Sequence, residues 1–373
     1  MLFSHSDFQL GSKLDSTVDA GNNNYIHKAM RANYLPYGID FSNTPTGRFT
    51  NRKTIANLFG IILLTTVNCT LPLVWFGFIL IISSKCFKFN FLCCDVIREA
   101  ILYNLSLPPP YLNLTEAQRK ATMDGINYAS VGCGISPNTK PTRFDCWSLQ
   151  IQIEAFNRTV QEDLPCMIED PQELAEYLAN SILFISMGTN DYILNFNNHH
   201  DPEYFANYLL IQFRCHHDPE YFANSLLIQF RWLYYIGARN LVVNNIGPLG
   251  CLPSMINKTR NGQCDEKMNQ NIMPYNSQLP QILKTIEDEY PNATLTLANS
   301  YDFLQHILAD TEKYGFTDVK DPCCGVYVQG EIACIPNYST PCDNRCHSLF
   351  FDANHTSEFA NCIFVRDMLI IKD

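Results

Sequence analysis

Three side chains near the two ends of the chain could together perform acyl transfer: Ser16, Asp352 and His355. A serine hydroxyl is a weak nucleophile at neutral pH, so an imidazole must accept its proton. A carboxylate must in turn orient that imidazole and stabilise its charged form. Asp352 and His355 are three positions apart, so a tight loop or a helical turn can place both on one face. These residue types predict a nucleophile, an orienting aspartate and a base, and the reaction they favour is ester hydrolysis.

Short blocks of sequence around and between these residues occur in a fixed order. They are 15–24 (DSTVDAGNNN), 32–41 (ANYLPYGIDF), 45–51 (PTGRFTN), 127–130 (NYAS), 188–191 (GTND), 247–253 (GPLGCLP) and 352–355 (DANH). Together they resemble the plant GDSL esterase/lipases of the SGNH hydrolase superfamily, and the resemblance covers most of the chain. It implies a serine hydrolase that cleaves carboxylic esters, such as lipids or other acyl esters, through an acyl-enzyme.

The resemblance also implies which groups stabilise the charge that develops on the carbonyl oxygen. These are the backbone N–H of Ser16, the backbone N–H of Gly47 and the side-chain amide of Asn190. Such donors matter because the loss of one typically slows a reaction by about 10²–10³-fold. Glycine leaves room for the ligand, and an amide donates without titrating. Asp191 is expected to shape the loop that carries Asn190, and Asp19 to cap a loop or helix.

Alternating apolar and helical patterns predict the fold that positions these residues. Apolar runs at 182–187, 240–246 and 293–298 have the length of buried strands, and a helical pattern covers 268–290. This order implies a parallel sheet with helices on both faces. Sites in such sheets lie beyond the carboxyl ends of the strands. We therefore expect a single domain over 1–373, with the three-layer α/β/α fold and central parallel sheet of SGNH, flavodoxin-like hydrolases.

An apolar segment at about 60–93 interrupts this pattern. The run 61–82 is long enough to suggest a transmembrane helix. Pro72 and the many β-branched residues disfavour a regular helix there. The helical pattern of 54–59 continues at 95–100, which favours an insert within a helix. A membrane span stays open as the alternative, although a membrane is not the expected partner.

Residues 199–232 are a tandem duplication of a 17-residue segment. The copies differ at two positions, Tyr208/Ser225 and Cys215/Trp232. Two copies are too few for a solenoid. The second copy runs into the helical pattern before 240–246, so it is predicted to fill the structural position, and the first copy to be a surface excursion. The paired histidines at 199–200 could suggest a metal site, but copies of a surface loop are the favoured interpretation.

Composition limits the partners. The chain has 37 acidic and 26 basic residues, a formal net charge of −11. This balance and the lack of basic runs argue against nucleic acid and anionic membrane surfaces. A small-molecule ester or lipid is the expected substrate. No cofactor is expected, because no phosphate-binding loop or other cofactor motif occurs.

Sixteen cysteines favour an oxidising compartment and several disulfides. Sequons that suit a secreted glycoprotein occur at Asn104, Asn113, Asn157, Asn257, Asn292 and Asn337. The first residues show no signal peptide, so an extracellular location is inferred from the cysteines, the sequons and the family. A zinc site at Cys342-x3-Cys346-His347 is a weaker alternative, because no second pair has metal-ligand spacing. No metal is expected.

One departure from the family pattern lies just before Ser16. Residues 8–14 are polar where the family has an apolar strand, and Leu14 replaces a glycine. Glycine at such a turn permits unusual backbone angles and close approach of a ligand. The departure favours an alternative function: a catalytically impaired family member that acts as a non-enzymatic extracellular binding protein.

Overall fold

The computed structural model describes residues 17–59, 107–123, 125–196, 201–211, 225–328 and 330–370. Within these residues the chain forms an α/β fold around a parallel sheet. The strands β1 (Ile182–Ser186), β2 (Asn240–Asn244) and β3 (Thr294–Ala298) pair in the order β1-β2-β3. All three are in register from their first residue to their last. The strands coincide with the predicted apolar runs, so the prediction of an α/β fold with a parallel sheet is confirmed.

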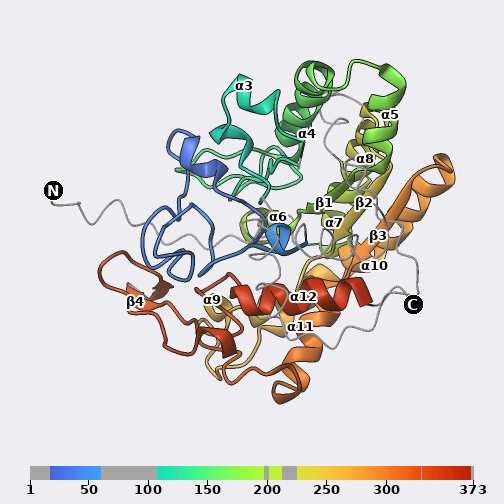
Figure 1. The fold of residues 1–373 in the computed structure, drawn as a ribbon. Coiled ribbons are helices and arrows are strands. Elements are labelled where there is room, and N and C mark those ends of the chain that lie inside the picture. Colours follow the sequence, from blue (N-terminus) through green and yellow to red (C-terminus); the bar gives the residue numbers. More distant parts are fainter. Residues whose placement is uncertain are drawn as a thin grey trace.

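Helices connect and cover these strands (Figure 1). The helices are α3 (Glu116–Arg119), α4 (Leu149–Arg158), α5 (Pro171–Asn180), α6 (Thr189–Asn195), α7 (Pro202–Leu210), α8 (Leu226–Ile236), α9 (Pro253–Ile256), α10 (Glu266–Glu289), α11 (Ser300–Ala309) and α12 (Glu358–Ile370). A small antiparallel hairpin, β4 (Val326–Val328) and β5 (Glu331–Ala333), precedes α12. In Figure 1, α11 and α12 lie together below the strands, and α4 and α5 lie above them. Phe303 of α11 packs against Phe364 of α12, with 5.0 Å between ring centroids.

The duplicated segment contributes to the core from both copies, and here the sequence-based prediction is wrong. The first copy forms α7, which packs against α10 rather than making a surface excursion. Phe205, Ala206 and Leu209 of α7 are completely or almost completely buried. Their spacing gives the first copy an apolar stripe, and Asp201 caps the helix by accepting from two backbone N–H groups. The first copy therefore has both an apolar face and an N-terminal cap, which together allow it to form a buried helix.

The second copy is described from Ser225, where it begins α8. Leu226 and Phe230 of that helix are fully buried, and Trp232 packs against the same core. The paired histidines of both copies fall outside the described residues. The apolar segment at 60–93 also falls outside them, and the described chain before it ends in a helical turn at 55–59. No helix in the described part of the chain is long and apolar enough to cross a membrane.

Disulfides stabilise the loops, as the cysteine content predicted. The pairs are Cys133–Cys146, Cys251–Cys264, Cys323–Cys342 and Cys324–Cys334. Because Cys342 is bonded to Cys323, it has no thiolate to offer the zinc site considered as an alternative. Cys324–Cys334 closes the base of the hairpin of β4 and β5, and Cys323–Cys342 joins that base to the loop that leads to α12.

Candidate active site

Asp352 and His355 are in direct contact in the loop before α12. Both carboxylate oxygens lie within hydrogen-bonding distance of His355 Nδ1, Oδ1 at 2.7 Å and Oδ2 at 2.6 Å. Each residue is 4% exposed. The backbone N–H groups of Asn354 and His355 donate to Asp352 Oδ1 at 2.8 and 2.9 Å, so the carboxylate also closes its own loop. From α9, the backbone N–H of Ser254 donates to the carbonyl of Ala353 at 2.9 Å, which fixes the loop from outside.

The surroundings of Asp352 keep it ionised. Burial alone would raise the pKa of this carboxyl group. The charge and hydrogen bond of His355, the Tyr37 hydroxyl and the Asn354 N–H outweigh burial and leave the pKa below its usual value. A carboxylate can only accept, so Nδ1 of His355 carries the proton and Nε2 is the basic nitrogen. This is the tautomer that a general base for a serine requires.

Gly47 lies in a segment that runs beside this loop. Phe49, two residues later, packs against the His355 ring with 5.1 Å between centroids. The Thr50 hydroxyl donates to the Thr356 carbonyl at 3.2 Å. Gly47 has a φ of 89°, and a Cβ there would lie 2.5 Å from the Asn24 amide nitrogen. Only glycine fits this position without displacing Asn24.

Asn190 is held rigidly in the first turn of α6, directly after β1. Gly188 makes the turn from strand to helix with a φ of 113°. The Asn190 amide donates to the Cys133 carbonyl at 2.8 Å, and its side chain is fully buried. The disulfide between Cys133 and Cys146 in turn fixes that carbonyl.

Asp191, the next residue of α6, anchors the loop at 135–139. Its carboxylate accepts from the backbone N–H groups of Ile135 and Ser136 at 2.9 and 3.1 Å, and from the Thr139 hydroxyl at 2.5 Å. Burial is the largest influence on this carboxyl group and raises its pKa to about 6, although these donors oppose the rise. A Cβ on Gly134 would lie 2.2 Å from the Asp191 carboxylate, so the loop and the carboxylate fit closely.

Asp19 and the asparagines after it hold the segment that follows Ser16 in the sequence. Asp19 accepts from the backbone N–H groups of Gly21 and Asn22 at 2.7 and 2.8 Å, so its expected capping role is confirmed. The Asn22 amide donates to the carbonyls of Asn127 and Ala129 at 2.8 and 2.9 Å. These hydrogen bonds join two of the sequence blocks, 15–24 and 127–130. The block at 127–130 therefore supports the segment that begins at Thr17. Burial raises the pKa of Asp19 to about 6.

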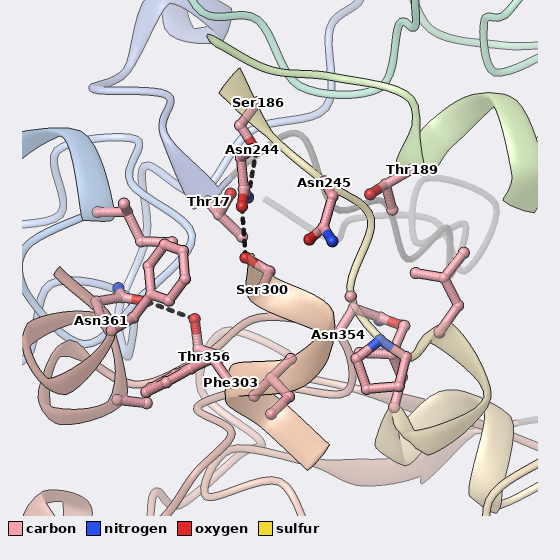
Figure 2. A pocket seen from close by; sticks show the side chains of 18 of the residues that line it. Thr17, Ser186, Thr189, Asn244, Asn245, Ser300, Phe303, Asn354, Thr356 and Asn361 are labelled. Carbon is pink, nitrogen blue, oxygen red and sulfur yellow. Dashed lines mark hydrogen bonds between the residues drawn. The ribbon is translucent and has the colours of Figure 1, made fainter. Parts of the chain in front are cut away.

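Ser16 itself lies outside the described residues, but its neighbour Thr17 is described. Thr17, Thr189 and Asn354 line one cavity of about 70 Å³ at the carboxyl ends of the strands (Figure 2). These three residues adjoin Ser16, Asn190 and His355 in the sequence. Ser300 donates to Asn244 in the cavity wall at 2.7 Å. The chain neighbours of the predicted nucleophile, oxyanion donor and base thus meet at one edge of the sheet.

Sequence reasoning missed one residue that contacts the site. The hydroxyl of Tyr37 donates to Asp352 Oδ2 at 2.6 Å. The block at 32–41 contains Tyr37, but nothing in the sequence indicated which distant residue it touches.

Comparison with known proteins identifies the family. The model of the GDSL-like lipase/acylhydrolase family matches residues 94–367. The chain belongs to this family. Among its relatives, GDSL esterase/lipase 7 of Arabidopsis thaliana is 32% identical over 357 residues, which cover 95% of this chain and 85% of that protein. GDSL esterase/lipase At1g71691 of the same plant is 30% identical over 360 residues, 94% of this chain and 79% of that protein. The resemblance inferred from the sequence blocks is confirmed.

Proposed function

We propose that this GDSL family member hydrolyses carboxylic esters through an acyl-enzyme on Ser16. The observation that carries the proposal is the buried pair of Asp352 and His355, in which an ionised carboxylate holds Nδ1 and leaves Nε2 as the base. In the first step Nε2 takes the proton of the Ser16 hydroxyl while the oxygen attacks the ester carbonyl carbon. The protonated imidazole then gives this proton to the departing alcohol.

Water completes the reaction by the same route. Nε2 takes a proton from water as the water oxygen attacks the acyl carbon, and the bond to Ser16 Oγ breaks as that oxygen regains a proton. The carbonyl oxygen is negatively charged in both tetrahedral intermediates. We assign its stabilisation to the backbone N–H groups of Ser16 and Gly47 and to the amide of Asn190. Two contacts support this assignment: the close fit of Gly47 against Asn24, and the hydrogen bond from the Asn190 amide to the Cys133 carbonyl. Each contact holds a proposed donor in place before substrate binds.

The proposed substrate is a small-molecule carboxylic ester, either a lipid or another acyl ester. The proposed location is extracellular. Four disulfides and exposed sequons at Asn113, Asn292 and Asn337 support this location. Asn354 also begins a sequon, but its side chain is buried and its Oδ1 accepts from the Ser254 hydroxyl, so a glycan there is incompatible with this loop.

Hydrolysis of p-nitrophenyl butyrate by purified protein tests the proposal. The wild type should release p-nitrophenol, and Ser16→Ala should reduce the rate to background. Gly47→Ala should cost about 10²-fold in kcat, because it displaces one proposed donor. Gly330→Ala is the matched control: Gly330 also has a positive φ, of 86°, but no atom lies within 4 Å of an added Cβ. Folded wild-type protein without activity would instead favour the non-enzymatic binding protein.

A further inference from the structure

Tyr37 and Asp352 are 315 positions apart in the sequence, yet the tyrosine hydroxyl touches the carboxylate that orients the base. Tyr37 is 5% exposed. Its hydroxyl lies 2.6 Å from Oδ2, the same oxygen that lies 2.6 Å from His355 Nδ1. Among the described residues, Tyr37 is the one donor to this carboxylate from outside the loop 352–355.

The tyrosine ring is held in place on several sides. It packs against the rings of Tyr34, Phe49 and Phe351, with centroids 5.3, 5.5 and 5.7 Å away. Phe49 also packs against the His355 ring, so the same aromatic cluster contacts both members of the pair. The backbone N–H of the next residue, Gly38, donates to the Thr50 carbonyl at 3.1 Å.

An ion pair fixes the segment that follows Tyr37. Arg345 donates to both carboxylate oxygens of Asp40, at 2.8 and 3.0 Å. The Asn51 amide donates to Asp40 Oδ2 at 2.8 Å. The Tyr37 hydroxyl is therefore placed by the fold before any substrate arrives.

We propose that Tyr37 is a positioning residue for the base: its hydroxyl fixes the plane of the Asp352 carboxylate and takes up part of its negative charge. The inference rests on the proposed function, since it concerns how the pair works as a base. Each carboxylate oxygen has a separate task. Oδ1 accepts the two N–H groups of its own loop, and Oδ2 accepts the hydroxyl from the other end of the chain.

A charge effect follows from this contact. Burial and the neighbouring carboxylate raise the pKa of Tyr37 well above its ordinary value, so the hydroxyl stays protonated and remains a donor. Tyr34, whose pKa burial also raises, is the other titratable group of the aromatic cluster. A carboxylate that loses a donor attracts a proton more strongly. Without the Tyr37 hydroxyl, the pair of Asp352 and His355 should therefore take up a proton at higher pH.

The test compares Tyr37→Phe with Tyr128→Phe. Both changes remove one hydrogen-bonded tyrosine hydroxyl, but that of the half-buried Tyr128 donates to Thr159 at 2.9 Å instead of to the pair. In Tyr37→Phe, kcat/KM should fall roughly tenfold with the loss mainly in kcat, and the acid limb of the pH profile should move up by about half a unit to one unit. Tyr128→Phe should leave both the rate and the position of the limb as in the wild type. An unshifted limb in folded Tyr37→Phe would show that the ring only packs and would overturn the inference.

A second measurement does not depend on activity. In protein with 13C-labelled histidine, the NMR titration of the His355 ring should shift upward in Tyr37→Phe and not in Tyr128→Phe. If the wild type is inactive and this shift is present, the positioning role stands and the proposed function falls. If Tyr37→Phe does not fold, 3-fluorotyrosine at position 37 keeps the hydroxyl and makes it a stronger donor. The titration should then move to lower pH, and no movement would contradict the role.

Discussion

Two buried carboxylates, Asp352 and Asp191, have nearly the same hydrogen-bonding pattern, but their pKa values are shifted in opposite directions. Each accepts two backbone N–H groups and one side-chain hydroxyl. The donors to Asp352 are Asn354 N, His355 N and the Tyr37 hydroxyl. The donors to Asp191 are Ile135 N, Ser136 N and the Thr139 hydroxyl. The pKa of Asp352 lies below its usual value, whereas burial raises the pKa of Asp191 to about 6.

The imidazole of His355 accounts for the difference. Among the described hydrogen-bonding partners of the two carboxylates, it is the one that can carry a positive charge. Its Nδ1 lies within hydrogen-bonding distance of both oxygens of Asp352. Asp191 has only neutral donors, and these do not offset the free energy lost when a charged carboxylate is removed from water, so its pKa is raised. The comparison separates two environments of a buried carboxylate: Asp352 is paired with an imidazole that can carry charge, and Asp191 holds the loop at 135–139 in place with neutral donors.

The largest expected effect comes from Asp352→Asn. The amide would present an N–H to Nδ1 and favour the wrong tautomer of His355, so kcat should fall by about 10³–10⁴-fold. The remaining amide oxygen can still accept from the two loop N–H groups, so the melting temperature should fall less than in Asp191→Ala. Steady-state kinetics and thermal unfolding of the same preparation test both expectations. Retention of more than a tenth of wild-type activity would show that the two carboxylates do not differ in this way.

For Asp191→Ala we expect the opposite balance: a large loss of stability and a smaller loss of activity. The change removes the acceptor of three buried donors, so the free energy of unfolding should fall by about 3–5 kcal/mol. Activity should fall less than in Asp352→Asn, because Asp191 contacts the loop at 135–139 and can affect Asn190 only through the start of α6. Urea unfolding and kinetics measure the two quantities. A stable variant with an activity loss as great as that of Asp352→Asn would make Asp191 part of the reaction.

The pH dependence of stability should distinguish the two carboxylates. The folded-state pKa of Asp191 is about 6 against a usual value of 3.8, so the folded protein binds this proton more tightly than the unfolded chain. Its contribution to stability therefore decreases as pH rises from about 4 to 6. Asp19, also at about 6, contributes in the same direction. The lowered pKa of Asp352 contributes stability that is lost only as pH falls below the usual value, outside this window.

Asp191→Asn should therefore remove a decrease of about 2 kcal/mol in the free energy of unfolding between pH 4 and 6. Asp352→Asn should keep that decrease. Urea unfolding at several pH values, with each variant compared with the wild type, checks the difference. Equal slopes in all three proteins would contradict the assignment for Asp191.

The smallest effect concerns the support of Asp191 by the duplicated segment. The Tyr208 hydroxyl of α7 lies 2.9 Å from the hydroxyl of Ser136, whose N–H donates to Asp191. Deletion of 209–225 leaves one copy that keeps both Tyr208 and Trp232. Deletion of 199–215 leaves a copy with serine in place of that tyrosine, and it should be less stable than the first by about 1 kcal/mol. Equal melting temperatures of the two single-copy proteins would show that the Tyr208 contact contributes nothing.

The parts of this structure that depend on local sequence could be predicted, and the parts that depend on distant contacts could not. Asp352 and His355 are three positions apart, so their contact follows from a single turn. The three strands follow from short apolar runs. The contact between Tyr37 and Asp352 joins opposite ends of the chain, and no local pattern encodes it. The burial of α7 was missed because two nearly identical copies have the same local pattern, and only tertiary packing, such as that of α7 on α10, shows that both copies contribute to the core.

The central claim is that the pair of Asp352 and His355 activates Ser16, and covalent labelling with a fluorophosphonate probe tests it most directly. Ser16 lies in the tryptic peptide 14–28, which contains no other serine. Mass spectrometry of the labelled wild type should find the probe on this peptide. The label should be absent in Ser16→Ala and strongly reduced in His355→Ala. A probe found on another peptide, or no label at all on folded wild-type protein, would contradict the account.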